Sequence, residues 1–219
     1  MTPPTATATT RRAAARRASA ARRAAGRRRR RWLLLLGAAA VVLVVVIAAM
    51  PLFKVAVSEF GLPLHDQSVI REQAAAKNLD PALIAAVIYA ETKFDPRTSS
   101  AGAVGLMQIL PQTAIFLARR SGATTFKTAD LATPAVNIAY GSYYLRYLLD
   151  QYHGSTMLAL AAYNGGQANV SHWIAAAHAE GHRFGRFDIA FPETRAYVEK
   201  VFSARSDYRR TYASQLGIG

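Results

Sequence analysis

A single acidic residue stands where an apolar segment turns into a tight polar loop, in the stretch IYAETKFDPRTSSAGAVGLMQILPQTA at residues 88–114. This residue is Glu91, and the apolar residues before it indicate the end of a buried helix. A carboxyl group at such a place loses water, and desolvation raises its pKa. A carboxylic acid that is still protonated near neutral pH can protonate a leaving oxygen, which cleavage of a glycosidic bond requires.

A second carboxylate would complete the usual glycosidase pair, and the nearest one in the sequence is Asp95. Asp95 directly precedes Pro96, a pair typical of turns, so we interpret Asp95 as structural. One acid is enough when the substrate supplies its own hydroxyl group, because the same residue then acts first as acid and then as base. The pattern alone leaves three roles open for Glu91: a solvated helix end, a buried structural acid or a catalytic acid.

The sequence favours no other kind of catalytic site. It contains no Cys, which excludes a disulfide framework, a thiolate zinc site and a Cys nucleophile. His178 and His182 have i, i+4 spacing, but Gly181 lies between them and no Glu takes the position that the HExxH motif requires. No GxSxG elbow marks a serine nucleophile. We predict no metal and no cofactor.

The formal charge of +14 is concentrated at one end of the 219-residue chain. Residues 1–31 hold eleven of the 27 Lys and Arg and no acidic residue, so the remainder is nearly balanced. This segment is predicted to be disordered. Residues 32–53 carry no charge over 22 positions, enough for a helix to cross a bilayer. We predict an uncleaved transmembrane anchor, because the run is longer than the apolar part of a signal peptide and lacks a good cleavage site.

The Arg-rich segment also predicts the orientation of the anchor. Positive residues keep their flank in the cytoplasm, which places the chain after about residue 54 outside the cytoplasmic membrane. Attraction to anionic lipid accounts for the Arg residues without nucleic acid, so a DNA-binding tail is the weaker alternative. The remaining boundaries are predicted as a juxtamembrane linker at 54–65, a folded domain at 66–208 and a C-terminal tail at 209–219.

The outer portion has the pattern of an α domain. Asp80-Pro81 is a strong helix start, with an N-cap acceptor followed by Pro at the first helical position. Further helices are predicted around Ile70 and Ala74, from about Pro111, at 133–152, on both sides of YNGG at 163–166, and at 192–208. No convincing alternating pattern indicates a strand. A domain of about 150 residues is large enough for one hydrophobic core.

Four segments in order resemble the SLT-type lytic transglycosylases, a bacterial peptidoglycan-cleaving family related to goose-type lysozyme. They are ETKFDP…SSAGAVGLMQILPQTA from Glu91, NIAYGSYYLRYLL at 137–149, ALAAYNGGQANV at 159–170 and FPETRAYVEKV at 191–201. One such segment would be a weak signal, but four in order are specific. The resemblance spans about residues 66–205 and implies a mainly α, lysozyme-like domain with a groove for a glycan strand.

The resemblance also implies roles for individual residues. It makes Glu91 the single acid and base. The other implied positions are the groove-lining Met107 and Gln108, Tyr163 and Asn164 below the site, and Tyr197, which approaches the acid from the final helix. Met107 and Tyr163 have a plain alternative as core residues.

The loop after the acid departs from the family pattern by one residue. Counting forward from Glu91 places the family's serine at Ser100, whereas counting back from Gly102 places it at Ser99. The glycines fix the shape of the backbone, so the count that gives Ser99 is favoured. Both serines are candidates for the substrate-binding site.

The reaction implied by the resemblance is cleavage of the β-1,4 bond between N-acetylmuramic acid and N-acetylglucosamine, with formation of 1,6-anhydromuramyl ends. The implied partners are the glycan strands of peptidoglycan. Two alternatives stay open: hydrolysis to a reducing end, as in goose-type lysozyme, and an inactive glycan-binding protein of the cell envelope.

Overall fold

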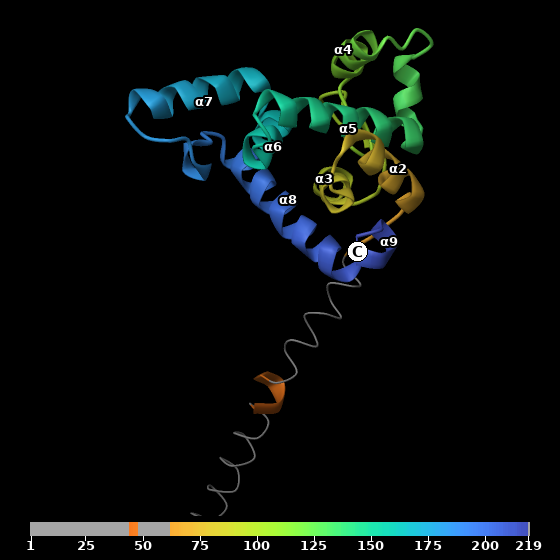
Figure 1. Cartoon of the computed structure of the whole chain (residues 1–219), viewed down its shortest axis with the longest axis horizontal. Helices are drawn as coiled ribbons and strands as arrows, with labels where there is room; N and C mark the ends of the chain where they lie inside the picture. The colour runs from red at the N-terminus through yellow and green to blue at the C-terminus, as the bar shows by residue number, and fades with distance from the viewer. Residues whose placement is uncertain (1–43, 48–61, 219) are drawn as a thin grey trace, which may run out of the picture. The chain divides into compact units, whose positions relative to one another are not determined.

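Residues 62–218 fold mainly into helices in the computed structural model, which describes residues 44–47 and 62–218 (Figure 1). The longer helices are α2 (Gln67–Lys77), α3 (Pro81–Thr92), α4 (Pro111–Ser121), α5 (Pro134–Gln151), α6 (Thr156–Gly165), α7 (Gln167–Ala179) and α8 (Pro192–Thr211). The shorter elements are β1 (Arg97–Thr98), β2 (Val104–Gly105), the 3-10 helices η1 (Thr128–Ala132) and η2 (Arg186–Asp188), and α9 (Ala213–Leu216). The prediction of a mainly α outer portion is confirmed.

The predicted anchor and its flanks lie almost entirely outside the described residues. This applies to the tail at 1–31, to the span at 32–53 except for residues 44–47, and to the linker up to residue 61. Residues 44–47 are helical and their side chains are exposed. Among the described residues, no helix is both long enough and apolar enough to cross a membrane.

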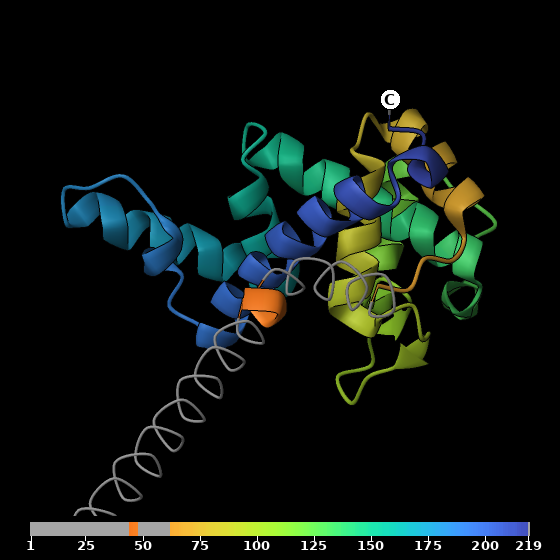
Figure 2. The same cartoon turned by 90° about the horizontal axis from the view of Figure 1, so that it is seen from below.

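The helix that carries the predicted acid starts where the sequence predicts. The Asp80 carboxylate accepts a hydrogen bond from the Ala82 N–H at 3.0 Å, and Pro81 occupies the first turn. Every residue at 82–88 is buried, because α3 is covered by other helices and α8 runs along one side of it (Figures 1 and 2). α3 ends in left-handed backbone at Lys93, which has a φ of 54°, and the chain turns there into the loop.

One stripe of α8 is buried where this helix packs along α3 and against α6. The members of the stripe are Thr194, Tyr197, Val198, Val201, Ala204 and Tyr208. Farther along α8, Arg205 and Arg209 donate to the Asp80 carboxylate at 2.5 and 3.0 Å, which ties the start of α3 to α8. α8 continues to Thr211, beyond the predicted helix end at residue 208, and α9 follows with Leu216 buried.

α5 contacts α2 near one end and α6 near the other (Figure 1). Its apolar stripe of Ile138, Gly141, Leu145 and Leu148 is buried. Gly141 is required here because α5 passes close to Met107: a Cβ at Gly141 would lie 2.7 Å from the Met107 Cβ. α6 and α7 flank the YNGG turn as predicted, and α7 extends away from the other long helices (Figures 1 and 2).

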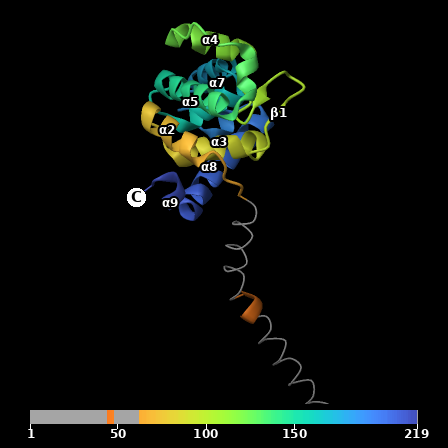
Figure 3. The ribbon, with the colours of Figure 1, turned by 90° about the vertical axis from the view of Figure 1, so that its right-hand side faces the viewer.

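A short antiparallel hairpin follows α3, where the sequence showed no strand pattern (Figure 3). Arg97 pairs with Gly105, and Thr98 pairs with Val104. Two residues in each strand are too few for an alternation of apolar and polar residues to appear in the sequence. The hairpin joins the end of α3 to the segment that contains Met107.

Candidate active site

Glu91 lies in the last turn of α3 and is partly buried. Burial raises the pKa of its carboxyl group to about 7, although Tyr197, Lys200 and Arg97 each counter part of the rise. Near neutral pH this group is divided between the acid and the carboxylate. It can therefore give up a proton and take one back under the same conditions.

Two tyrosines approach Glu91 from different helices. Tyr163 of α6 donates its hydroxyl hydrogen to the Met107 carbonyl oxygen at 2.8 Å. Burial, and secondly the charge of Glu91, hold the pKa of both the Tyr163 and the Tyr197 phenol well above the usual value, so both stay protonated. The Tyr197 hydroxyl is buried and close enough to the Glu91 carboxyl group to lower its pKa, and it forms no other hydrogen bond among the described residues.

Two cations contact the backbone around Glu91. Arg97 Nη2 donates to the Glu91 carbonyl oxygen at 2.9 Å, and Lys200 Nζ donates to the Ala90 carbonyl oxygen at 2.7 Å. Neither cation was identified from the sequence. Arg97 lies in the two-residue strand β1 and Lys200 on an exposed face of the final helix, and a charge at either place in the sequence indicates only contact with solvent.

Met107 and Gln108 lie two and three residues after β2 and are fixed by hydrogen bonds. Met107 is fully buried, and its N–H donates to the Asn137 Oδ1 at 2.7 Å. Gln108 has a φ of 49°, and its side-chain amide donates to the carbonyl oxygens of Arg97 and Gly105, each at 2.8 Å. The Gln108 side chain thereby holds the two strands of the hairpin together.

Asn137 is a supporting residue that the sequence analysis did not single out. It is fully buried in the first turn of α5, and its Nδ2 donates to the carbonyl oxygens of Val104 at 2.8 Å and Leu131 at 3.0 Å. Gly105 has a φ of 79°, and a Cβ there would lie 2.5 Å from the Asn137 Cγ. The sequence offered one signal for this role, since Asn137 is a polar residue on the same face of α5 as the buried apolar stripe.

A hollow of about 240 Å³ lies between the segment after β2, α5 and the turn from α6 to α7. It is lined by Gln108, Ile109, Leu110, Thr113, Tyr144, Ala162, Tyr163, Asn164, Gly165 and Gly166. Three of the predicted site residues therefore come together here from two distant segments. The exposed Asn164 is held in place, since its Oδ1 accepts a hydrogen bond from the Thr194 hydroxyl at 2.8 Å.

Ser99 and Ser100 lie in the hairpin loop, and neither hydroxyl forms a hydrogen bond with Glu91 among the described residues. The Ser99 hydroxyl accepts from the Ala103 N–H at 3.1 Å, and the Ser99 N–H donates to the Ala103 carbonyl oxygen at 2.9 Å. Ser100 is exposed. The site therefore joins Glu91 to two tyrosines, while Ser99 is bonded within the adjacent loop and Ser100 is exposed there.

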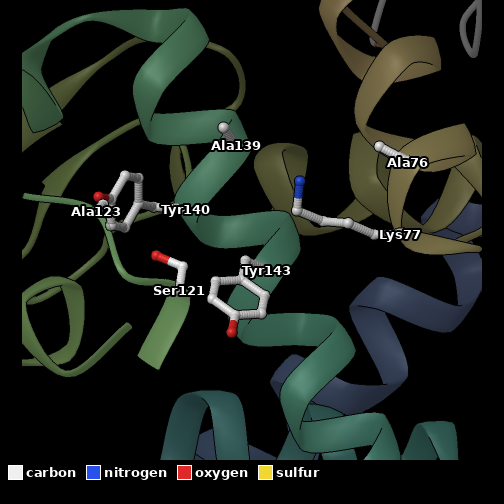
Figure 4. Close-up of a pocket in the computed structure, with 7 residues that line it drawn as sticks. All are labelled: Ala76, Lys77, Ser121, Ala123, Ala139, Tyr140 and Tyr143. Carbon is white, nitrogen blue, oxygen red and sulfur yellow. The ribbon is translucent and has the colours of Figure 1, made fainter. Parts of the chain in front are cut away.

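A larger hollow of about 430 Å³ lies between the ends of α2 and α4 and the first half of α5 (Figure 4). Its lining consists of Ala76, Lys77, Ser121, Ala123, Ala139, Tyr140 and Tyr143. Lys77 extends toward α5 across this space, and its ammonium group donates to Gln73 Oε1. No predicted site residue lines this hollow, so its greater size does not make it the candidate active site.

The domain is mainly helical and carries one partly buried acid at the end of a buried helix. The Tyr163 phenol, which senses the charge of this acid, lines a hollow together with amide groups, and the arrangement is that of a lysozyme-like class of protein. The model of the family described as Transglycosylase SLT domain matches residues 68–183. The chain belongs to this family, as the four ordered motifs indicated.

Individual relatives are similar over the outer portion of the chain. The soluble lytic murein transglycosylase of Salmonella typhimurium is 31% identical over 156 residues, which are 67% of this chain and 23% of the relative. Membrane-bound lytic murein transglycosylase C of Yersinia enterocolitica is 30% identical over 166 residues, covering 65% of this chain and 46% of the relative. The chain thus spans less than half the length of these relatives.

The fold matches a solved structure in the same family. It is the X-ray structure of an inactive mutant of the lytic transglycosylase Slt from Pseudomonas aeruginosa, in which glutamine replaces a glutamate. The TM-score is 0.63 at 31% identity, over 72% of this chain and 25% of the other. This likeness supports the lysozyme-like fold class of the outer portion.

Proposed function

We propose that the chain is a peptidoglycan lytic transglycosylase that cleaves the β-1,4 bond between N-acetylmuramic acid and N-acetylglucosamine. The observation that carries the proposal is the carboxyl group of Glu91, whose pKa of about 7 suits both donation and removal of a proton. Membership of the SLT family and the names of the relatives support the reaction class. The inactive glutamate-to-glutamine mutant of the Pseudomonas relative supports a glutamate as the essential acid.

The proposed reaction uses Glu91 twice and needs no water. The protonated carboxyl group gives its proton to the glycosidic oxygen, and the bond from that oxygen to C1 of muramic acid breaks. The carboxylate then removes the proton from the C6 hydroxyl of the same sugar, and the C6 oxygen bonds to C1. The products are a 1,6-anhydromuramyl end and a free hydroxyl on N-acetylglucosamine, and Glu91 regains its proton.

A single acid fits the surroundings of Glu91. The groups that perturb its pKa are a phenol and two cations, with no second carboxylate among them. Asp95, the nearest acid in the sequence, is exposed. A retaining or inverting glycosidase needs two carboxyl groups that flank the bond, whereas the anhydro route needs one.

The remaining predicted residues receive roles from their positions. Gln108 and Asn164 present polar groups to the hollow. Met107 is buried next to Gln108 and supports the segment that lines the hollow. Tyr197 keeps a protonated phenol beside Glu91 and can donate to its carboxylate in the second step, whereas the hydroxyl hydrogen of Tyr163 is held by the Met107 carbonyl oxygen. The serine of the hairpin loop contributes a hydroxyl to the sugar or to the acid, with Ser99 favoured over Ser100.

The attachment to the membrane is part of the proposal and depends on the sequence. We assign residues 1–31 to the cytoplasm, 32–53 to the anchor, 54–65 to the linker and 66–208 to an extracytoplasmic SLT domain, followed by the tail at 209–219. The membrane-bound relative from Yersinia supports a location at the membrane. Protease added to intact spheroplasts should remove the outer domain, and cleavage of the tail alone would show that the orientation is reversed.

Mass spectrometry of the products from purified peptidoglycan tests the reaction. The proposal predicts anhydro ends, and it predicts that Glu91→Gln lowers turnover by a factor of about 10² to 10⁴, the usual loss for general acid–base catalysis. Reducing ends would indicate hydrolysis of the goose-type lysozyme kind. Binding of glycan without any product would indicate an inactive glycan-binding protein.

A further inference from the structure

Glu91 occupies an unfavourable end of its helix for a carboxylate. The last four carbonyl groups of a helix have no partner within the helix, and together they form its negative end. The carboxyl group of Glu91 lies in this last turn of α3, so the helix end adds to burial in favouring the protonated form. Burial and the helix end together would hold the proton too tightly for a residue that must also act as a base.

Two cations from different elements occupy this helix end. Lys200 reaches from α8 to the Ala90 carbonyl oxygen at 2.7 Å, and its Nζ lies 5.5 Å from the centre of the Tyr89 ring. Arg97 reaches back from β1 to the Glu91 carbonyl oxygen at 2.9 Å and to the Thr92 carbonyl oxygen at 3.4 Å. Three successive carbonyl groups around the acid are thereby bound by positive side chains.

Apart from these two cations, the groups that act on Glu91 are uncharged. Tyr197 of α8 and Tyr163 of α6 hold neutral phenols. Lys93 follows α3 directly and is exposed, but it is not among the groups that shift the pKa of Glu91. Lys200 and Arg97 are the two charges that lower this pKa against the effect of burial.

We propose that Arg97 and Lys200 are positioning residues, which bind the carbonyl end of α3 and so set the balance of Glu91 between its acid step and its base step. The inference rests on the proposed function, since it assigns to these residues the tuning of the same acid. A general acid that later acts as the base works best when neither form is strongly favoured. The two cations bring a buried carboxyl group at a helix C-terminus back into that range.

The test measures the protonation of Glu91 directly, without substrate. The full chain in detergent, labelled with ¹³C at the Glu carboxyl carbons, is titrated by NMR, and the Glu91 signal is identified by its loss in Glu91→Gln. Arg97→Gln and Lys200→Gln should each raise the Glu91 midpoint by about 0.2 to 0.7 pH unit, the effect of a surface cation at a helix C-terminus. The conservative variants Arg97→Lys and Lys200→Arg should restore most of the shift.

The matched control is Lys93→Gln, which removes the same charge beside the helix end without a bond to a carbonyl group of α3. The Glu91 midpoint in this variant should stay near that of the unaltered protein. An unchanged or lowered midpoint in Arg97→Gln and Lys200→Gln would overturn the inference, as would an equal shift in Lys93→Gln.

The same variants are then assayed for release of anhydro products between pH 5 and pH 9. Because the reaction starts from the protonated acid, the alkaline limb of kcat/KM should move to higher pH by the amount seen in the titration. Raised midpoints without anhydro products from any variant or from the unaltered protein would sink the proposed reaction but not the electrostatic role of the two cations. Anhydro products together with unchanged Glu91 midpoints would support the proposed reaction and overturn the electrostatic role of the two cations.

Discussion

Replacement of Glu91 by Gln should make the protein more stable at neutral pH while it removes the acid. In the folded protein, burial raises the pKa of this carboxyl group from 4.5 to about 7. The folded state therefore binds the proton more tightly than the unfolded chain does. The contribution of the protonated group to the free energy of unfolding is fully present below about pH 4.5 and is lost as the pH rises through about 7.

The size of the effect follows from the shift. A difference of about 2.5 pKa units, at about 1.4 kcal/mol per unit, corresponds to about 3 kcal/mol. Glutamine keeps the size of the side chain and cannot ionise, so it escapes this loss. The free energy of unfolding of Glu91→Gln should match that of the unaltered protein near pH 4 and exceed it by up to about 3 kcal/mol at pH 8.

Urea unfolding of the full chain in detergent at several pH values between 4 and 8 measures this difference. Glu193→Gln is the control, since it makes the same change at an exposed position at the start of α8 and should not reproduce the difference seen for Glu91→Gln. A stability difference for Glu91→Gln that stays constant from pH 5 to pH 8 would refute the claim that Glu91 is desolvated in the folded state.

Three further changes probe the supports of the site. Asp80→Ala removes the N-cap of α3 and the acceptor of two Arg side chains, and should lower the free energy of unfolding by about 1 to 2 kcal/mol in urea melts. Asn137→Leu removes hydrogen bonds to the backbone of Met107, Val104 and Leu131, including the one from the buried Met107 N–H, and should cost at least about 2 kcal/mol in the same assay, whereas a neutral result would show that the loop does not depend on it. Ser99→Ala should slow release of anhydro products by about tenfold and Ser100→Ala much less, and equal small losses would mean that neither hydroxyl serves Glu91.

Much of the fold could be predicted because local rules specify it. Asp80-Pro81 starts α3 through a hydrogen bond and a fixed φ that involve only neighbouring residues. The apolar spacing in α5 predicted its buried stripe, since helical geometry brings those positions onto one face. The hairpin at 97–105 escaped prediction because its strands are too short to carry a periodic signal, and its pairing depends on Asn137 and Gln108 from outside the strands.

The sequence by itself determined the family and the order of the motifs and made Glu91 the candidate acid, because residue types and spacing can be read without coordinates. Only the tertiary structure decided the state of that acid. The phenols of Tyr163 and Tyr197, and the cations of Arg97 and Lys200, reach Glu91 from separate elements. Desolvation and charge act through space over a few ångströms, so the pKa of about 7 is a property of the assembled domain and of no single segment.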